Sequence, residues 1–178
     1  MSSTFSAPRW SYSERLSRAI SPAARKLMRG VLVVHIKRAR NLVPRDKNGF
    51  SDPYAVVVVH GMRRFRTDVK YANLNPVWDQ FGHYSGTLGS FVKSAMIVKL
   101  YDYDRLNFND PLGVAAIDLT PLLEQSKLSA RNVPLTGVDH GTIDVAVHFE
   151  QTAVNFAYPT PVAASAFEAS FCDEDDIG

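Results

Sequence analysis

The chain has 178 residues, of which 46% are hydrophobic and 21% charged, so it is long enough for one globular domain with a substantial core. Its single cysteine, Cys172, excludes an intrachain disulfide and a cysteine-based zinc site, and we therefore expect a cytoplasmic protein. No apolar run reaches the roughly 18 to 20 residues of a transmembrane helix, and the basic N-terminus lacks the apolar segment of a secretory signal. Any contact with a membrane is expected to be peripheral and reversible.

The net charge of +2 conceals an uneven distribution of charges along the chain. Residues 1–29 contain six Lys or Arg against Glu14, residues 30–150 sum to +2, and residues 151–178 contain five acids and no base. We predict a basic, Ser- and Arg-rich tail over residues 1–28, one domain over 29–150, and an acidic tail over 151–178 that is rich in Ala and aromatic residues.

The basic tail permits three interpretations. Leu16, Ile20, Ala24 and Leu27 would share one face of an amphipathic membrane-surface helix, but a transit-like presequence and a disordered segment fit the composition equally. Ser21 followed by Pro22 is typical of the N-cap and first turn of a short helix. The composition of the acidic tail predicts a flexible segment, although its aromatic residues would also allow it to dock on the domain or to serve as a contact motif for a protein partner.

From Gly30 onward, apolar residues alternate with other residues at period two, which predicts β-strands. Turn residues separate these strands, and a short helix is expected only at Leu119–Gln125 within the domain, because Thr120 and Pro121 open it. The pattern favours an all-β, eight-stranded antiparallel sandwich. The predicted strands are Gly30 to Lys37, Tyr54 to His60, Arg63 to Val69, Val77 to Tyr84, Ala95 to Tyr101, Leu112 to Ile117, Arg131 to Leu135, and Thr142 to Phe149.

Five aspartates fall in two tight groups about fifty residues apart, each in a loop beside an apolar strand: Asp46, Asp52, Asp102, Asp104 and Asp110. Calcium takes about six to eight oxygen ligands, and a carboxylate supplies one or two of them. Gathering these side chains without a cation is costly, because two like charges about 4 Å apart repel by roughly 4 kcal/mol at an effective dielectric near 20. Each aspartate alone would be an ordinary turn residue, but the set together indicates a calcium site in two halves.

Three stretches of the chain together resemble the C2 domain family, over about residues 29 to 150. These stretches are Asp46-Lys-Asn-Gly-Phe-Ser-Asp52-Pro-Tyr54, Asn73-Leu-Asn-Pro-Val-Trp78, and Asp102-Tyr-Asp104-Arg-Leu-Asn-Phe-Asn-Asp110-Pro-Leu-Gly113. The resemblance implies a Greek-key sandwich that binds Ca²⁺ between loops at one end, with the five aspartates as ligands. By the same resemblance, the backbone carbonyls of Arg45 and Tyr103 and the side chain of Asn107 are supplementary ligands. The clear last strand also suggests the circularly permuted type II topology.

Two other metal sites fit the sequence less well. An EF-hand loop requires Gly at position 6, whereas Gly49 stands at position 4 of the first stretch and Asn107 at position 6 of the second. Clustered aspartates also serve phosphoryl transfer with Mg²⁺, but no Walker-type loop, HExxH motif or Ser-His-Asp set with recognisable spacing is present. We therefore expect a binding module and not an enzyme.

The expected ligand is an anionic phospholipid such as phosphatidylserine. The empty loops would repel anionic headgroups, and two bound calcium ions would reverse that sign. Lys47 and Arg105 would then attract the membrane, while Leu106 and Phe108 insert between headgroups or are buried beneath the loops. For Phe50, burial beneath the loops is favoured over insertion.

A second basic cluster resembles the surface through which some relatives bind phosphoinositides: Arg63, Arg64, Arg66, Lys70 and Lys99. Strand alternation would place Arg64, Arg66 and Lys70 on one face if the strand has no bulge. A solvated outer sheet face is the alternative. Nucleic acid is not an expected partner, because the domain is only weakly basic and has no stacking platform near these residues.

Two functions follow from the sequence. The first is a module that docks on anionic membranes when Ca²⁺ rises, in membrane targeting, trafficking or signalling. The second is a calcium-independent adaptor that uses the sandwich as a scaffold and the tails to contact a protein partner.

Overall fold

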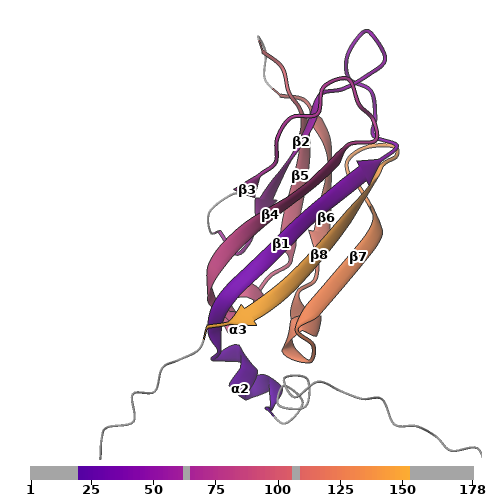
Figure 1. The fold of residues 1–178 in the computed structure, drawn as a ribbon. Coiled ribbons are helices and arrows are strands. Elements are labelled where there is room, and N and C mark those ends of the chain that lie inside the picture. Colours follow the sequence, from indigo (N-terminus) through magenta and orange to yellow (C-terminus); the bar gives the residue numbers. More distant parts are fainter. Residues whose placement is uncertain (1–19, 62–64, 106–108, 153–178) are drawn as a thin grey trace, which may run out of the picture.

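The computed structural model describes residues 20–61, 65–105 and 109–152 (Figure 1). Two four-stranded antiparallel sheets pack face to face, which confirms the predicted sandwich. The first sheet has the order β4 (Val77–Thr87), β1 (Arg29–Arg40), β8 (Thr142–Gln151), β7 (Lys127–Pro134). The second has the order β3 (Phe65–Arg66), β2 (Pro53–Val58), β5 (Met96–Asp102), β6 (Pro111–Ile117).

The core lies between the two sheets. Because side chains alternate along a strand, every second side chain points into this core. Leu32, Val34 and Ile36 of β1 are fully buried, and so are Val57 of β2 and Val98 of β5 in the opposite sheet. Burying one such side chain contributes about 1.5–3 kcal/mol. For β1, the alternation of Leu32, Val34 and Ile36 read from the sequence therefore identifies the inward side correctly.

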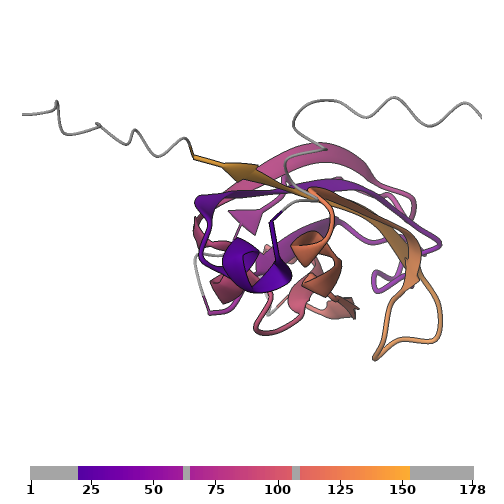
Figure 2. The same cartoon turned by 90° about the horizontal axis from the view of Figure 1, so that it is seen from below.

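Short helices close the end of the sandwich away from the β1–β2 loop (Figures 1 and 2). Helix α2 (Pro22–Lys26) begins at Ser21, whose hydroxyl accepts the Ala24 N–H at 3.3 Å, as the Ser-Pro signal predicted. It contacts η1 (Thr120–Leu123), a 3₁₀ helix inside the expected range, and α3 (Leu88–Phe91). Leu27 was predicted to lie on the apolar face of a helix, but α2 ends at Lys26 and Leu27 is 80% exposed. No helix in the described part of the chain is long and apolar enough to cross a bilayer.

Two predictions about these elements were wrong. Helix α3 was not expected, since four residues are too few to show a helical period; Thr87 caps it by accepting the Ser90 N–H at 3.2 Å. The strand predicted from Arg63 to Val69 is reduced to Phe65–Arg66 within the described residues. It ends there because the side chain of Gln80 accepts the next free amide, the N–H of Asp68, at 2.8 Å.

The β1–β2 connection carries Asp46 and Asp52, and the β5–β6 connection carries Asp104 and Asp110. Both connections lie at the same end of the sandwich, at the top of Figure 1. Strand β1 leads directly into the first connection, as the permuted topology requires. Residues 1–19 lie outside the described chain, so the permuted assignment stays a prediction.

Candidate functional site

Backbone hydrogen bonds join the two aspartate loops. The Asp52 N–H donates to Asp102 Oδ1 at 2.6 Å, and the Tyr103 N–H donates to the Asp52 carbonyl at 3.0 Å. Across the second loop, the Asp102 N–H donates to the Asp110 carbonyl at 2.8 Å. Residues that are about fifty positions apart in sequence are therefore neighbours, as the two-half site predicted.

Asp102 is the buried member of the set, with 3% of its surface exposed. Burial raises the pKa of its carboxyl group, and the charges of Asp46 and Asp52 raise it further. Hydrogen bonds from the Asp52 N–H and the Ser51 side chain oppose this shift without cancelling it. Burial is the main cause of the raised pKa and the charges of Asp46 and Asp52 are lesser causes, and a bound cation would favour the ionised form against all three.

Asp46 and Asp104 lie in the turns of their loops. The Asp46 carbonyl accepts the Gly49 N–H at 3.0 Å, and Gly49 has a φ of 83°, which a glycine adopts without strain. The Asp104 N–H donates to Asn109 Oδ1 at 3.1 Å. Among the described residues, no three His, Cys, Asp or Glu side chains are gathered closely enough to hold a metal ion. The donor set thus suits a hard cation chemically, but its side chains do not surround one common point in this arrangement.

A third loop lies beside these two and was not identified from the sequence. The Ala72 N–H donates to Asp52 Oδ1 at 2.7 Å, and the Lys70 and Asn73 N–H groups donate to the carbonyls of Pro53 and Ser51. The only sequence signal was the Asn73-Leu-Asn-Pro stretch. Tyr71, at the outer part of this loop, is 64% exposed.

The role of the supplementary ligands stays a prediction. Arg45 and Tyr103 lie in the aspartate loops, and Asn107 lies outside the described residues. The Arg45 guanidinium also donates to the Pro111 carbonyl through Nε at 3.3 Å and Nη2 at 3.0 Å. Sequence reasoning did not anticipate this brace between the first loop and β6.

The residues predicted to face lipid are in part exposed. Lys47 and Arg105 are exposed, while Leu106 and Phe108 lie outside the described chain. The expected burial of Phe50 is wrong, since this side chain is 45% exposed. Its backbone instead takes part in the turn, where the Phe50 carbonyl accepts the N–H groups of Arg45 and Asp46.

The second basic cluster is partly assembled on the outer face of the second sheet. Arg66 and Lys99 both pair with Val56 in register, so their side chains flank it on the same face. The Arg66 guanidinium lies 4.1 Å from the ring centroid of Tyr54 and 5.9 Å from that of Tyr103. Lys70 follows β3 in the third loop, and Arg63 and Arg64 lie outside the described residues.

Comparison with known proteins agrees with this geometry. The family model described as "C2 domain" matches residues 30–136, which is more than half of the chain. Rat piccolo is 34% identical over 138 residues, which cover 63% of this chain and 2% of piccolo. Human synaptotagmin-3 is 35% identical over 97 residues (53% of this chain, 16% of synaptotagmin-3). Protein C2-DOMAIN ABA-RELATED 5 of Arabidopsis thaliana is 33% identical over 118 residues (66% of this chain, 56% of that protein).

Solved structures share the fold. The paired C2 domains of Extended-Synaptotagmin 2 match with a TM-score of 0.60 and 21% identity, over 85% of this chain and 47% of that one. The calcium-bound form of the same domains matches with a TM-score of 0.59 and 24% identity, over 71% and 47%. This chain spans only a small part of the first curated relatives it matches, about 2% of piccolo. On the matched family model, this chain belongs to the C2 domain family.

Proposed function

We propose that this C2 domain binds anionic phospholipid membranes when calcium occupies the aspartate loops. The observation that carries the proposal is the position of Asp102, which is buried, accepts the Asp52 N–H and lies near Asp46 and Asp52. Burial first, and then the charges of these two neighbours, raise its pKa. Excess negative charge in a loop pair built from oxygen donors suits a hard divalent cation. The calcium-bound relative supports the choice of cation.

Five carboxylates at the loop end would hold the domain away from an anionic surface. Calcium bound to these carboxylates would add positive charge, and its remaining coordination positions would accept further oxygen ligands. With the carboxylates neutralised, the exposed bases Lys47 and Arg105 contribute about 1 kcal/mol each near an anionic leaflet. The exposed aromatic rings of Phe50 and Tyr71, on two neighbouring loops, add apolar contact with the headgroup region.

A phosphoinositide surface on the second sheet is a further part of the proposal. Its support is the placement of Arg66 and Lys99 on either side of Val56, with Arg66 stacked on Tyr54. Stacking fixes the guanidinium plane and leaves its edge available for hydrogen bonds to phosphate oxygens. We propose a cytoplasmic module that associates with membranes reversibly and has no catalytic role. The alternative remains an adaptor whose tails bind a protein partner.

Calorimetric titration of the full chain with Ca²⁺ tests the proposed cation site. We expect saturable heat from the wild type and little heat from Asp102→Asn combined with Asp104→Asn. Glu124→Gln is the matched control, since it removes an exposed carboxylate just after η1, away from the aspartate loops. Absence of heat from the wild type, or equal heat from the double variant, would contradict the calcium mechanism and favour the adaptor.

A further inference from the structure

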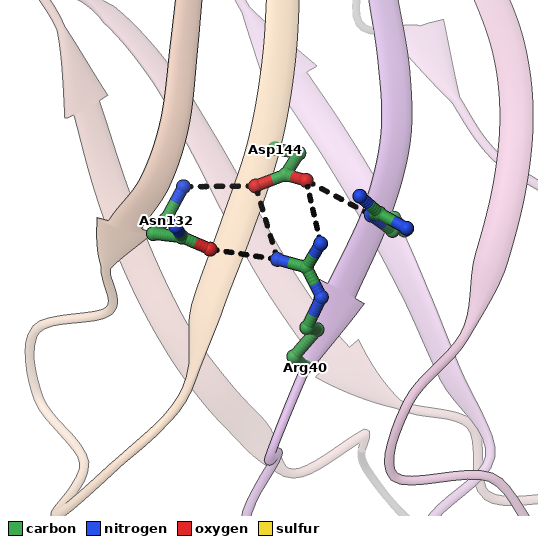
Figure 3. A network of polar contacts seen from close by, with 4 residues as sticks. Arg40, Asn132 and Asp144 are labelled. Atoms are coloured by element: carbon green, nitrogen blue, oxygen red, sulfur yellow. Dashed lines mark hydrogen bonds and ion pairs between the residues drawn. The ribbon is translucent and has the colours of Figure 1, made fainter.

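A second cluster of charged residues lies on the outer face of the first sheet, on the strands β1, β8 and β7 (Figure 3). Asp144 of β8 accepts the Arg38 Nε–H at 2.9 Å on Oδ2, and the same oxygen forms an ion pair with Arg40 Nη2 at 3.2 Å. Its Oδ1 accepts the Asn132 N–H at 2.8 Å and the Arg40 Nη1–H at 3.4 Å. Arg40 Nη1 also donates to Asn132 Oδ1 at 2.7 Å. We call these four residues the Asp144 cluster.

The members of the Asp144 cluster differ in how exposed they are and in how many of their polar atoms have partners within the described chain. The Asp144 side chain is 5% exposed; its Oδ1 accepts two hydrogen bonds, and its Oδ2 accepts one and forms an ion pair. Arg40 is 37% exposed and engages both terminal nitrogens. Arg38 is 49% exposed, and its hydrogen bonds within the described chain involve Nε alone. The two terminal nitrogens of Arg38 therefore remain available for an external acceptor.

The Asp144 cluster carries more positive charge than is needed to neutralise its one carboxylate. Asp144 is held ionised: burial alone would raise its pKa, but the Asn132 N–H, Arg38 and Arg40 together lower it. One guanidinium suffices to neutralise one carboxylate, and Arg40 already does so with two nitrogens. Arg38 adds a second guanidinium to the same carboxylate, so two positive charges face one negative charge and the cluster carries a net charge of +1. An external anion would balance this charge.

The backbone fixes this arrangement in place. Asn132 has a φ of 52°, in the left-handed region, at a bulge of β7 between Ala130 and Val133. Asparagine tolerates this conformation better than most residues, and the bulge aims the Asn132 N–H and side chain at Asp144 and Arg40. The guanidinium groups are thus oriented before any ligand arrives, which reduces the entropic cost of binding.

The surroundings of Arg38 leave its outward edge accessible to an anion. In register, Arg38 faces Asp144 on one side and Val77 of β4 on the other, and Val77 is 57% exposed. The next acid on β4 is Asp79, which is paired with His35 at 2.5 Å. Lys37 and Arg131 are the adjacent bases in sequence and increase the positive charge of this region.

We propose that the outward edge of Arg38, supported by Arg40, Asp144 and Asn132, is a binding site for a phosphate group. The fork of a guanidinium matches two phosphate oxygens, and the cluster offers one unbalanced positive charge. The site lies on the first sheet, on the opposite side of the sandwich from Arg66 and Lys99, and it contains none of the five loop aspartates. It therefore does not depend on the calcium proposal.

The test follows the Arg38 Nε–Hε signal of the full chain by NMR during titration with inorganic phosphate in chelator. The background carries Arg66→Ala and Lys99→Ala, so that the other basic surface does not contribute. We expect a saturable shift in this background. In Arg38→Ala, phosphate binding is followed at the remaining signals of the cluster, and we expect it to be weaker by about tenfold or more. Arg38→Lys keeps the charge but loses the fork, and it should also weaken binding. Lys93→Ala, which removes an exposed base just after α3, should not.

Two further arms identify the source of the phosphate. Phosphatidylcholine vesicles with and without phosphatidic acid are compared with free phosphate: loss of vesicle binding in Arg38→Ala assigns a lipid headgroup, and an effect on free phosphate alone assigns a soluble ligand. Equal shifts in sodium chloride at the same ionic strength, or equal weakening by Lys93→Ala, would overturn the site. Tighter binding of an acidic peptide than of phosphate would overturn the ligand class. Thermal unfolding confirms that each variant is folded. If Arg38→Ala does not fold, Arg38→Lys still tests the site, because it keeps the charge and loses the fork.

Discussion

Asp102 combines two properties that work against each other. Its burial and its neighbours Asp46 and Asp52 raise its pKa, so the ionised side chain destabilises the folded chain when no cation is bound. The same ionised oxygens are what a calcium ion would require. A residue that costs stability in a loop pair rich in carboxylates is typical of a binding site.

This conflict predicts that Asp102→Asn stabilises the protein in chelator. Asparagine keeps an oxygen for the Asp52 N–H but carries no charge, so repulsion from Asp46 and Asp52 is removed. We expect the Tm at pH 7 to rise by about 2–4 °C, which corresponds to about 1 kcal/mol for a chain of this size. Because a raised carboxyl pKa costs stability above that pKa, the difference from wild type should shrink as the pH falls towards about 4. Thermal unfolding followed by circular dichroism measures this, and a lower Tm at pH 7 would refute it.

Asp144 predicts the opposite dependence on pH. Its pKa is lowered in the folded chain, so its contribution is complete above the ordinary carboxyl pKa near 4 and is lost as the pH falls through the lowered value. We expect Asp144→Asn to cost about 2–3 kcal/mol at pH 7, because Arg38 and Arg40 lose their charged partner. Urea unfolding at pH 7 and near pH 3 should show that cost falling in acid. An equal cost at both pH values would argue against the ionic role.

Among the secondary-structure elements, strands with clear alternation were predictable and short elements were not. β8 was assigned from Thr142, as observed, because Ile143, Val145, Val147 and Phe149 all point into the core. The boundaries of β7 were not, since it begins at Lys127 and contains the Asn132 bulge, for which the sequence offers no period. Helix α3 has four residues, too few to show a helical period even though its Thr87–Ser90 cap is local. The end of two-residue β3 involves a hydrogen bond between Asp68 and Gln80, which lie on different segments.

The candidate site was predictable to a similar degree. The two aspartate loops were located from residue type and spacing, and their hydrogen bonds through Asp52 and Asp102 agree with that placement. The third loop with Ala72, the Arg45 brace and the Asp144 cluster were missed. Each depends on a contact between segments far apart in sequence, which no local pattern encodes.

Packing between β4 and β3 predicts a sensitive position at Gly82. A Cβ atom there would lie 2.6 Å from Phe65 Cγ, so Gly82→Ala must displace Phe65, which directly precedes Arg66 in β3. We expect a loss of about 1–3 kcal/mol in the free energy of unfolding, together with weaker phosphoinositide binding. Urea unfolding checks the first effect, with Ser85→Ala, an exposed position on the same strand, as control. Wild-type stability in Gly82→Ala would show that β3 adjusts without cost.

Across the molecule, the fold separates three charged regions. The aspartate loops occupy one end of the sandwich (Figure 1), Arg66 and Lys99 lie on the outer face of the second sheet, and the Asp144 cluster lies on the first. Helix α2 closes the other end, where Arg25 Nη2 donates to the Leu122 carbonyl at 3.2 Å. The proposed sites therefore lie on separate surfaces: the loop end would face a membrane, and the two sheet faces would stay accessible to other anionic ligands.

Calcium at the aspartate loops is proposed to switch the loop end from repelling to attracting anionic membranes. Co-sedimentation of the full chain with phosphatidylserine-containing vesicles tests this switch, in calcium and in chelator, with Asp102→Asn combined with Asp104→Asn as the variant and Glu124→Gln as the control. We expect wild type and Glu124→Gln to pellet with vesicles only in calcium, and the double variant to pellet in neither condition. Equal pelleting of the wild type in calcium and in chelator, or calcium-dependent pelleting of the double variant, would contradict the switch.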